Sequence, residues 1–201
     1  MNERDIRARR ERKDARRNAE RVLEAAHALF AERGGDVTME EVARRAGVGV
    51  GTVYRRFPSK EHLFVAVSHA ACSATHECVK QAAESQPQPL QKLRAIIVTQ
   101  CQHSDQLAAL LDHQSLSSEH PYIQRVEQQA LYEALHHMFR HVIIEGQKQG
   151  VVRQGDPDVL AAFCLQLVHP RAVQQVRQTV GCSTEDMAEQ VVHFLMYGLK
   201  S

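Results

Sequence analysis

Hydroxyl and cationic side chains gather within residues 38–60, and their chemistry suits contact with a nucleic acid. Arg55 and Arg56 follow Tyr54 directly, while Thr52 precedes this group and Lys60 follows it. Lysine and arginine bind phosphates, and hydroxyl and guanidinium groups also reach base edges. The residue types therefore point to DNA as the partner of this segment.

Two other interpretations of the segment were weighed. Gly47, Gly49 and Gly51 suggest a dinucleotide-binding loop. However, Thr52 occupies the position where the GxGxxG motif needs its third glycine, and no strand is predicted before the motif. A plain pair of packed helices would leave the exposed polar cluster unexplained. The sequence has no GxSxG, P-loop or HExxH motif, so we predict that the protein is not an enzyme.

Two short helices joined at Gly47 must position these side chains. Thr38 and Glu41 have the spacing of a capping box that starts the first helix. The second helix fits 49–57 and ends before Pro58, since the residue preceding a proline avoids the α conformation. This arrangement predicts a helix-turn-helix, whose second helix fits the major groove of DNA.

The remaining sequence predicts only helices, so the expected fold class is all-α. One helix precedes the motif, and the long helix that follows it has Ser59 as its N-cap. His169 and Pro170 should kink or interrupt a later helix. The expected helices outside the motif are 18–33, 60–84, 90–102, 106–115, 121–149, 157–178 and 184–199.

From about Arg21 to Val67 the sequence resembles the TetR family of bacterial transcriptional repressors. The stretches VLEAAHALFAERG, TMEEVARRAGV and GTVYRRFPSKEHLF carry the resemblance, and the last is the most specific. It implies an all-helical homodimer with a three-helix DNA-binding domain and a larger ligand-binding and dimerisation domain. We therefore expect a DNA-binding domain at 18–64 (motif 38–57) and a helical ligand-binding and dimerisation domain at 65–201. The basic residues 1–17 would be a disordered arm or a helical extension that adds phosphate contacts.

The resemblance also implies which residues contact DNA. Bases or sugars would be met by Val50, Gly51, Tyr54 and Arg55, and phosphates by Thr38, Thr52, Arg56 and Lys60. The family often has serine and a polar residue where this chain has Gly49 and Val50. A valine packs on a thymine methyl group but cannot hydrogen-bond a base, so specificity would rest on Tyr54, Arg55 and DNA shape.

The body of the chain is expected to dimerise and to bind a small-molecule inducer. The last two helices, 157–178 and 184–199, would pair with a second subunit, so the double-stranded operator would be a (pseudo)palindrome. The ligand would shift the population away from the DNA-binding state. Candidates for its pocket are Leu107, Leu111, Met138, Phe139 and Phe163.

Histidine and cysteine leave other regulatory modes open. Eleven of the 12 histidines follow residue 60, and imidazole and thiolate groups bind zinc or copper. The two clusters are His62, His69, Cys72 and His76, and His136, His137 and His141. A metal- or thiol-sensing regulator, or one without an inducer, is the alternative; the main interpretation includes no metal or cofactor.

Composition agrees with a DNA partner. Residues 1–60 hold 15 of the 25 basic and 10 of the 24 acidic residues, a net charge of +5, whereas the rest carries −4. No apolar run of about 18 residues suggests a membrane partner, and the arginine-rich start does not resemble a signal peptide. Five cysteines without a CxxC pair favour a reducing compartment, so we expect a cytoplasmic protein.

Overall fold

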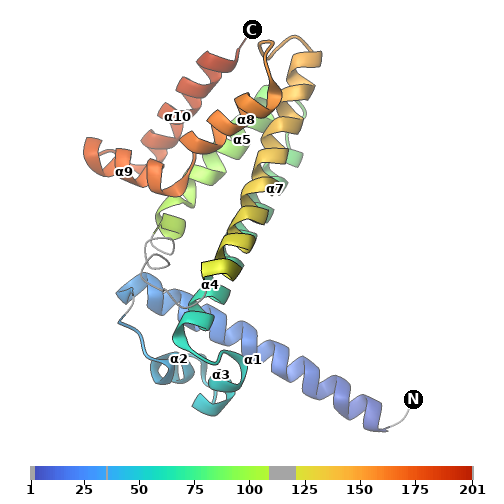
Figure 1. Cartoon of the computed structure of the whole chain (residues 1–201), viewed down its shortest axis with the longest axis vertical. Coiled ribbons are helices and arrows are strands. Elements are labelled where there is room, and N and C mark those ends of the chain that lie inside the picture. Colours follow the sequence, from blue (N-terminus) through green and yellow to red (C-terminus); the bar gives the residue numbers. More distant parts are fainter. Residues whose placement is uncertain (1–2, 35, 109–120, 201) are drawn as a thin grey trace. The chain divides into compact units, whose positions relative to one another are not determined.

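A computed structural model describes residues 3–34, 36–108 and 121–200 of the chain. The described residues form helices and one isolated antiparallel bridge, Val152 to Lys200, which confirms the all-α class (Figure 1). Residues 104–108 are also helical, and the rest of the helix expected at 106–115 lies outside the described residues. The labelled helices are α1 (Glu3–Arg33), α2 (Met39–Ala46), α3 (Val50–Arg56), α4 (Lys60–Glu84), α5 (Pro89–Gln102), α7 (Pro121–Lys148), α8 (Pro157–Leu167), α9 (Pro170–Val180) and α10 (Thr184–Leu199).

The chain divides into two compact units within α4. The first unit contains the chain up to Ala70, and the second begins at Ala71. The sequence placed the boundary between residues 64 and 65, within the same helix. No helix in the described ranges is long and apolar enough to cross a membrane.

In the first unit, α1 packs against α2 and α3. Val22, Ala26 and Phe30 recur every four residues, so they share the helix face that is buried in this packing. The ring of Phe30 meets that of Phe64, on α4, edge to face at a centroid distance of 5.0 Å. For residues 3–17 the structure has the second of the two expected forms, because α1 runs as one helix from Glu3.

In the second unit, α7 packs on α5 and α8, and α5 also packs on α10. The side chains at the centre of its core are fully buried: Leu93, Ile96, Ile97, Phe139 and Ile143. The interruption expected at His169 and Pro170 is confirmed, and it divides the predicted helix 157–178 into α8 and α9. Pro170 occupies the first turn of α9, where its missing N–H removes no helical hydrogen bond.

Candidate nucleic-acid interface

A capping box fixes the start of α2, as the sequence predicted. The Thr38 hydroxyl accepts a hydrogen bond from the Glu41 amide at 3.3 Å, and the Thr38 amide donates to Glu41 Oε2 at 2.9 Å. Arg33 Nη2 lies 2.8 Å from the same carboxylate oxygen. The Thr38 amide and the Arg33 guanidinium lower the pKa of Glu41 to about 2, so this carboxylate stays charged at neutral pH.

A second ion pair joins α1 to α2 near the other end of α2. Both terminal nitrogens of Arg45 donate to the carboxylate oxygens of Glu32, each at 2.8 Å. Such a two-point contact fixes orientation as well as distance. The two ion pairs therefore hold α2 on α1 at both ends, and α2 in turn supports α3.

Gly47 makes the turn between α2 and α3. Its φ of +63° lies in the left-handed region, and its N–H bonds to the carbonyls of Ala43 and Arg44 at the end of α2. The Arg21 guanidinium on α1 donates to the Gly47 carbonyl at 3.4 Å. A Cβ atom added to Gly47 would lie 2.6 Å from Arg21 Nη2, so the end of the arginine side chain would have to move.

Helix α3 has one buried and one exposed face. Val53 on the helix and Phe57 at its end are buried and anchor α3 in the first unit. Val50 and Tyr54, spaced four residues apart, are 41% and 44% exposed. A large apolar and an aromatic side chain held in solvent by a rigid helix suggest a surface that contacts another molecule.

The structure brings most of the predicted DNA-contacting residues onto this exposed side. Gly51, Arg55 and Arg56 are exposed with Val50 and Tyr54, and Thr52 is half-buried on the same helix. Lys60 is half-buried in the first turn of α4. Thr38 is exposed at the start of α2, where its hydroxyl also donates to Glu41 Oε2 at 3.1 Å.

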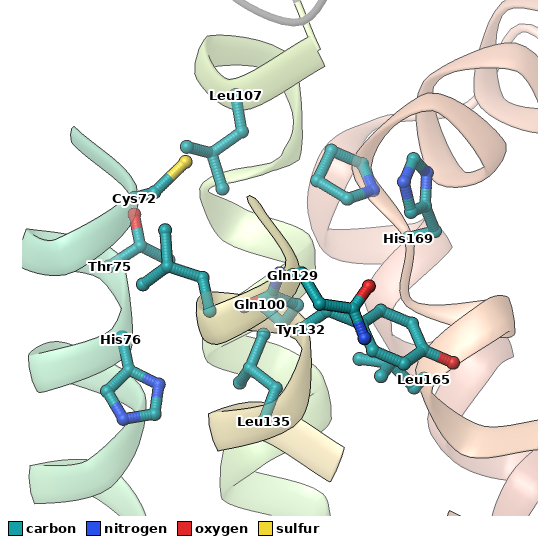
Figure 2. Close-up of a pocket in the computed structure, with 12 residues that line it drawn as sticks. Cys72, Thr75, His76, Gln100, Leu107, Gln129, Tyr132, Leu135, Leu165 and His169 are labelled. Carbon is teal, nitrogen blue, oxygen red and sulfur yellow. The ribbon is translucent and has the colours of Figure 1, made fainter. Parts of the chain in front are cut away.

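The second unit contains a cavity of about 440 Å³ that the sequence did not locate (Figure 2). Of the five candidates for a ligand pocket, Leu107 lines this cavity. Phe139 is fully buried in the core and Met138 packs against it, one turn along α7 from the cavity-lining Leu135. Phe163 is exposed elsewhere on α8, and Leu111 lies outside the described residues.

The remaining cavity residues were missed because they come from several helices. Periodicity shows which residues share one helix face, but it does not show which faces of different helices meet. Only the neighbouring positions on single helices could have been found, such as Cys72 with Thr75 and His76 on α4. The other lining residues are Gln100, Gln129, Leu131, Tyr132, Leu135, Leu165, His169 and Pro170.

A separate apolar groove of about 660 Å³ lies along α8 and α10. The side chains around it include Phe163, Phe194 and Tyr197, which are 61%, 68% and 84% exposed. Such large exposed apolar side chains on adjoining helices are typical of an interaction surface. The groove therefore falls on the two helical regions that the sequence assigned to dimerisation.

The described histidine and cysteine residues give the metal-sensing hypothesis no support, and three of the thiols are unreactive. Among the described residues, no group of three or more His, Cys, Asp or Glu side chains is placed to hold a metal ion. Burial raises the pKa of the Cys72 thiol, that of Cys101 to about 11 and that of Cys164 to about 12. These thiols are protonated at neutral pH and are therefore poor nucleophiles and metal ligands.

Taken together, α2, the Gly47 turn and α3 form a helix-turn-helix with its second helix exposed, which is the architecture of a DNA-binding protein. Residues 22–67 match the model of the bacterial regulatory proteins of the TetR family. This match confirms, over residues 22–67, the resemblance to the TetR family that was found in the sequence.

Known proteins resemble the chain in two ways. An HTH-type transcriptional regulator of Staphylococcus aureus (strain USA300) is 45% identical over 53 residues, which is 26% of this chain and 29% of that relative. The matched region thus spans less than a third of the relative's length. Over most of the chain the likeness is one of fold.

Two solved structures illustrate that likeness. A Saccharomonospora viridis protein described as a transcriptional regulator, in complex with choline, has a TM-score of 0.78 and 21% identity over 91% of this chain and 97% of its own. The complex of SmeT with triclosan has a TM-score of 0.68 and 17% identity over 92% of each chain.

Proposed function

We propose that this protein is a ligand-responsive transcriptional repressor that binds a (pseudo)palindromic operator as a homodimer. The observation that carries the proposal is the exposed face of α3, where Tyr54 and Arg55 stand in solvent on a helix anchored by Val53 and Phe57. The family match to residues 22–67 supports the same role for the first unit. The site of action would be the cytoplasm, where bacterial DNA is found, and the role is one of binding, with no catalytic step.

On this proposal α3 enters the major groove, where some side chains contact bases and others contact phosphates. Tyr54 and Arg55 reach base edges, and Val50 packs on a thymine methyl group. Arg56 and Lys60, with the hydroxyls of Thr38 and Thr52, bind the phosphates and set the register of the helix. Gly51 places no side chain between α3 and the DNA backbone.

A salt titration of DNA binding tests this assignment. The operator probe would be DNA from upstream of the protein's own gene, since regulators of this kind often control themselves, with a random duplex of equal length as competitor. We expect Lys60→Ala to weaken binding and to lower the slope of log Kobs against log salt by about 0.9 per subunit. Lys148→Ala removes an exposed cation from α7 and is the matched control, expected to leave the slope unchanged.

Specificity is tested by Tyr54→Ala on the same two DNA molecules. We expect the operator affinity to fall by about 1–3 kcal/mol, which is roughly tenfold or more, while random DNA is bound as before. If Tyr54→Ala bound the operator as tightly as the unaltered protein, α3 would not be the reading helix.

The proposed dimer forms when the groove of α8 and α10 packs on its counterpart in a second copy. The groove is apolar around Phe163, Phe194 and Tyr197, so a like surface is a chemically suitable partner. A two-fold axis through this contact would present two copies of α3 to the two halves of a palindrome. Continuity with the family's dimerisation region, which the sequence resemblance placed in the last helices, supports a second copy as the occupant.

Light scattering tests the dimer directly. The unaltered protein is expected at twice the mass of one chain, and Phe194→Asp at the mass of one chain because a buried carboxylate would lose its hydration. Val180→Asp places the same charge on an exposed valine of α9 that does not line the groove, and it should remain a dimer. If the Phe194→Asp protein were still a dimer, the dimer interface would lie outside this groove.

The cavity of the second unit supports the ligand-responsive part of the proposal. Its volume of about 440 Å³ lies in the range of small-molecule sites. Helix α4 carries Phe64 in the first unit and Cys72 and Thr75 at the cavity, so a ligand that repositions α4 would bias the DNA-binding state. A regulator without an inducer would keep its operator affinity in the presence of every small molecule tested.

A further inference from the structure

The described lining of the cavity in the second unit combines apolar and polar side chains and includes two histidines, His76 and His169. Its lining comes from α4, α5, α7, the helical residues 104–108 and the region where α8 gives way to α9. None of the 12 described residues that line it is an aspartate, glutamate, lysine or arginine. The described lining therefore offers no carboxylate, ammonium or guanidinium group as a counter-charge to an ionised ligand, which would lose its hydration on entry.

The imidazole of His169 does not provide a positive counter-charge for an anionic ligand. Burial, with the nearby Arg171 guanidinium, lowers the pKa of this imidazole below its usual value, so it is neutral at pH 7. Figure 2 shows His169 on the side opposite Cys72, Thr75 and His76. Apolar side chains, including Leu107, Leu135 and Leu165, make up much of the remaining wall.

A buried acceptor stands in this mostly apolar wall. The Gln100 side chain is 4% exposed, and within the described part of the chain its Oε1 atom has no hydrogen-bond partner. An amide oxygen buried without a partner is costly, and most such atoms in folded proteins are paired. Gln100 is among the residues that line the cavity and are labelled in Figure 2. A ligand with an N–H or O–H group would satisfy this oxygen.

We infer that the cavity binds an uncharged, largely apolar molecule that donates one hydrogen bond to Gln100 Oε1. This inference deepens the proposed function and rests on it for the regulatory role of the ligand. The volume of about 440 Å³ lies within the range of small-molecule sites, so a ligand of two or three rings fits. Flat aromatic amines, phenols and medium-length alcohols meet these requirements, whereas carboxylates, phosphate esters and quaternary ammonium ions do not.

The experiment uses the full chain and three probes of nearly equal shape. N-phenyl-1-naphthylamine is neutral and has one N–H donor, and its fluorescence rises in apolar surroundings. 1-Phenoxynaphthalene replaces that N–H by an oxygen and is measured by displacement of the amine. 8-Anilinonaphthalene-1-sulfonate carries the same ring system with an added anionic group. Dissociation constants for all three are measured at pH 7.5 by fluorescence titration.

The expected result has three parts. The neutral amine saturates one site per chain and binds at least tenfold more tightly than the sulfonate. Gln100→Leu weakens the amine by about two- to tenfold, the worth of one buried hydrogen bond, and leaves the ether unaffected or tighter. Leu135→Trp fills the cavity and abolishes saturable binding of the amine, whereas Phe163→Trp, at the separate groove, does not.

Several results would overturn the inference. They are absence of saturable amine binding, sulfonate binding as tight as that of the amine, and an equal effect of Gln100→Leu on amine and ether. Because Gln100→Leu and Leu135→Trp must be folded for the comparison, their circular dichroism spectra and melting temperatures are recorded with the titrations. A variant that fails to fold is replaced by Gln100→Met or Leu135→Phe, read in the same way.

The same samples separate this inference from the proposed function. Operator binding is measured with and without saturating amine. Amine binding in the expected pattern without any operator affinity would uphold the ligand class and refute the DNA-binding role. Operator binding with sulfonate favoured over amine would uphold the DNA-binding role and refute the ligand class.

Discussion

Gly51→Ala is expected to stabilise the protein and to weaken its binding to DNA. Gly51 lies in the first turn of α3, is exposed, and an added Cβ atom would have no neighbour within 4 Å. Alanine costs less backbone entropy than glycine in a helix, so the free energy of unfolding should rise by about 0.5–1 kcal/mol. For a unit of about 70 residues this corresponds to a melting temperature roughly 2–8 °C higher.

The affinity for DNA is expected to move in the opposite direction. If α3 lies in the major groove, the added methyl group stands where the helix backbone approaches the DNA, and we expect at least a tenfold loss. Stability is measured by far-ultraviolet circular dichroism, with hydrogen exchange of residues 39–56 to localise the change, and affinity by fluorescence anisotropy of a labelled operator.

Gly47→Ala is the contrasting variant because its glycine is needed for the turn. A φ of +63° costs an alanine about 1–2 kcal/mol, and the Cβ atom 2.6 Å from Arg21 Nη2 would displace that guanidinium from the Gly47 carbonyl. We expect the first unit to melt roughly 4–16 °C lower, with DNA affinity retained well below that temperature.

The prediction for Gly51→Ala is refuted if this substitution lowers the melting temperature, or if it raises the melting temperature and leaves the operator affinity unchanged.

Three further predictions concern other parts of the chain. Glu41→Gln should destabilise the protein at pH 7, because the Thr38 amide and Arg33 stabilise the charged carboxylate and lower its pKa to about 2. The difference in free energy of unfolding between the two proteins should vanish as the pH falls from 4.5 towards 2, and urea unfolding across that range measures it. Gly146→Ala should lower the free energy of unfolding by about 1–3 kcal/mol, as measured by thermal unfolding, since its Cβ atom would lie 2.4 Å from Val152 Cγ2. An unchanged melting temperature would mean that the Val152 side chain moves aside without cost. Deleting residues 1–16 should reduce the salt slope of DNA binding, and an unaltered slope would exclude phosphate contacts by this basic segment.

Local rules account for the parts of the structure that the sequence predicted well. The capping box of Thr38 and Glu41 and the helix break at Pro170 both depend on residues within four positions of one another. These interactions involve only residues that are close in the sequence, so one sequence is enough to find them. The exposed face of α3 follows similarly, because burial of Val53 and Phe57 turns Tyr54 and Arg55 outward.

The cavity of the second unit depended on information that no single segment contains. Leu135 and Phe139 lie one turn apart on α7, yet the first lines the cavity and the second fills the core, because different helices pack against successive turns. The same applies to Gln100, whose position on a buried face of α5 does not show whether its amide finds a partner. Thus the sequence by itself determined most helices, the capping box and the exposed face of α3. Only the packing of α4, α5, α7 and α8 decided which side chains surround a space that a ligand can enter, because hydrophobic burial is non-directional and becomes specific only when side chains from distant helices interlock.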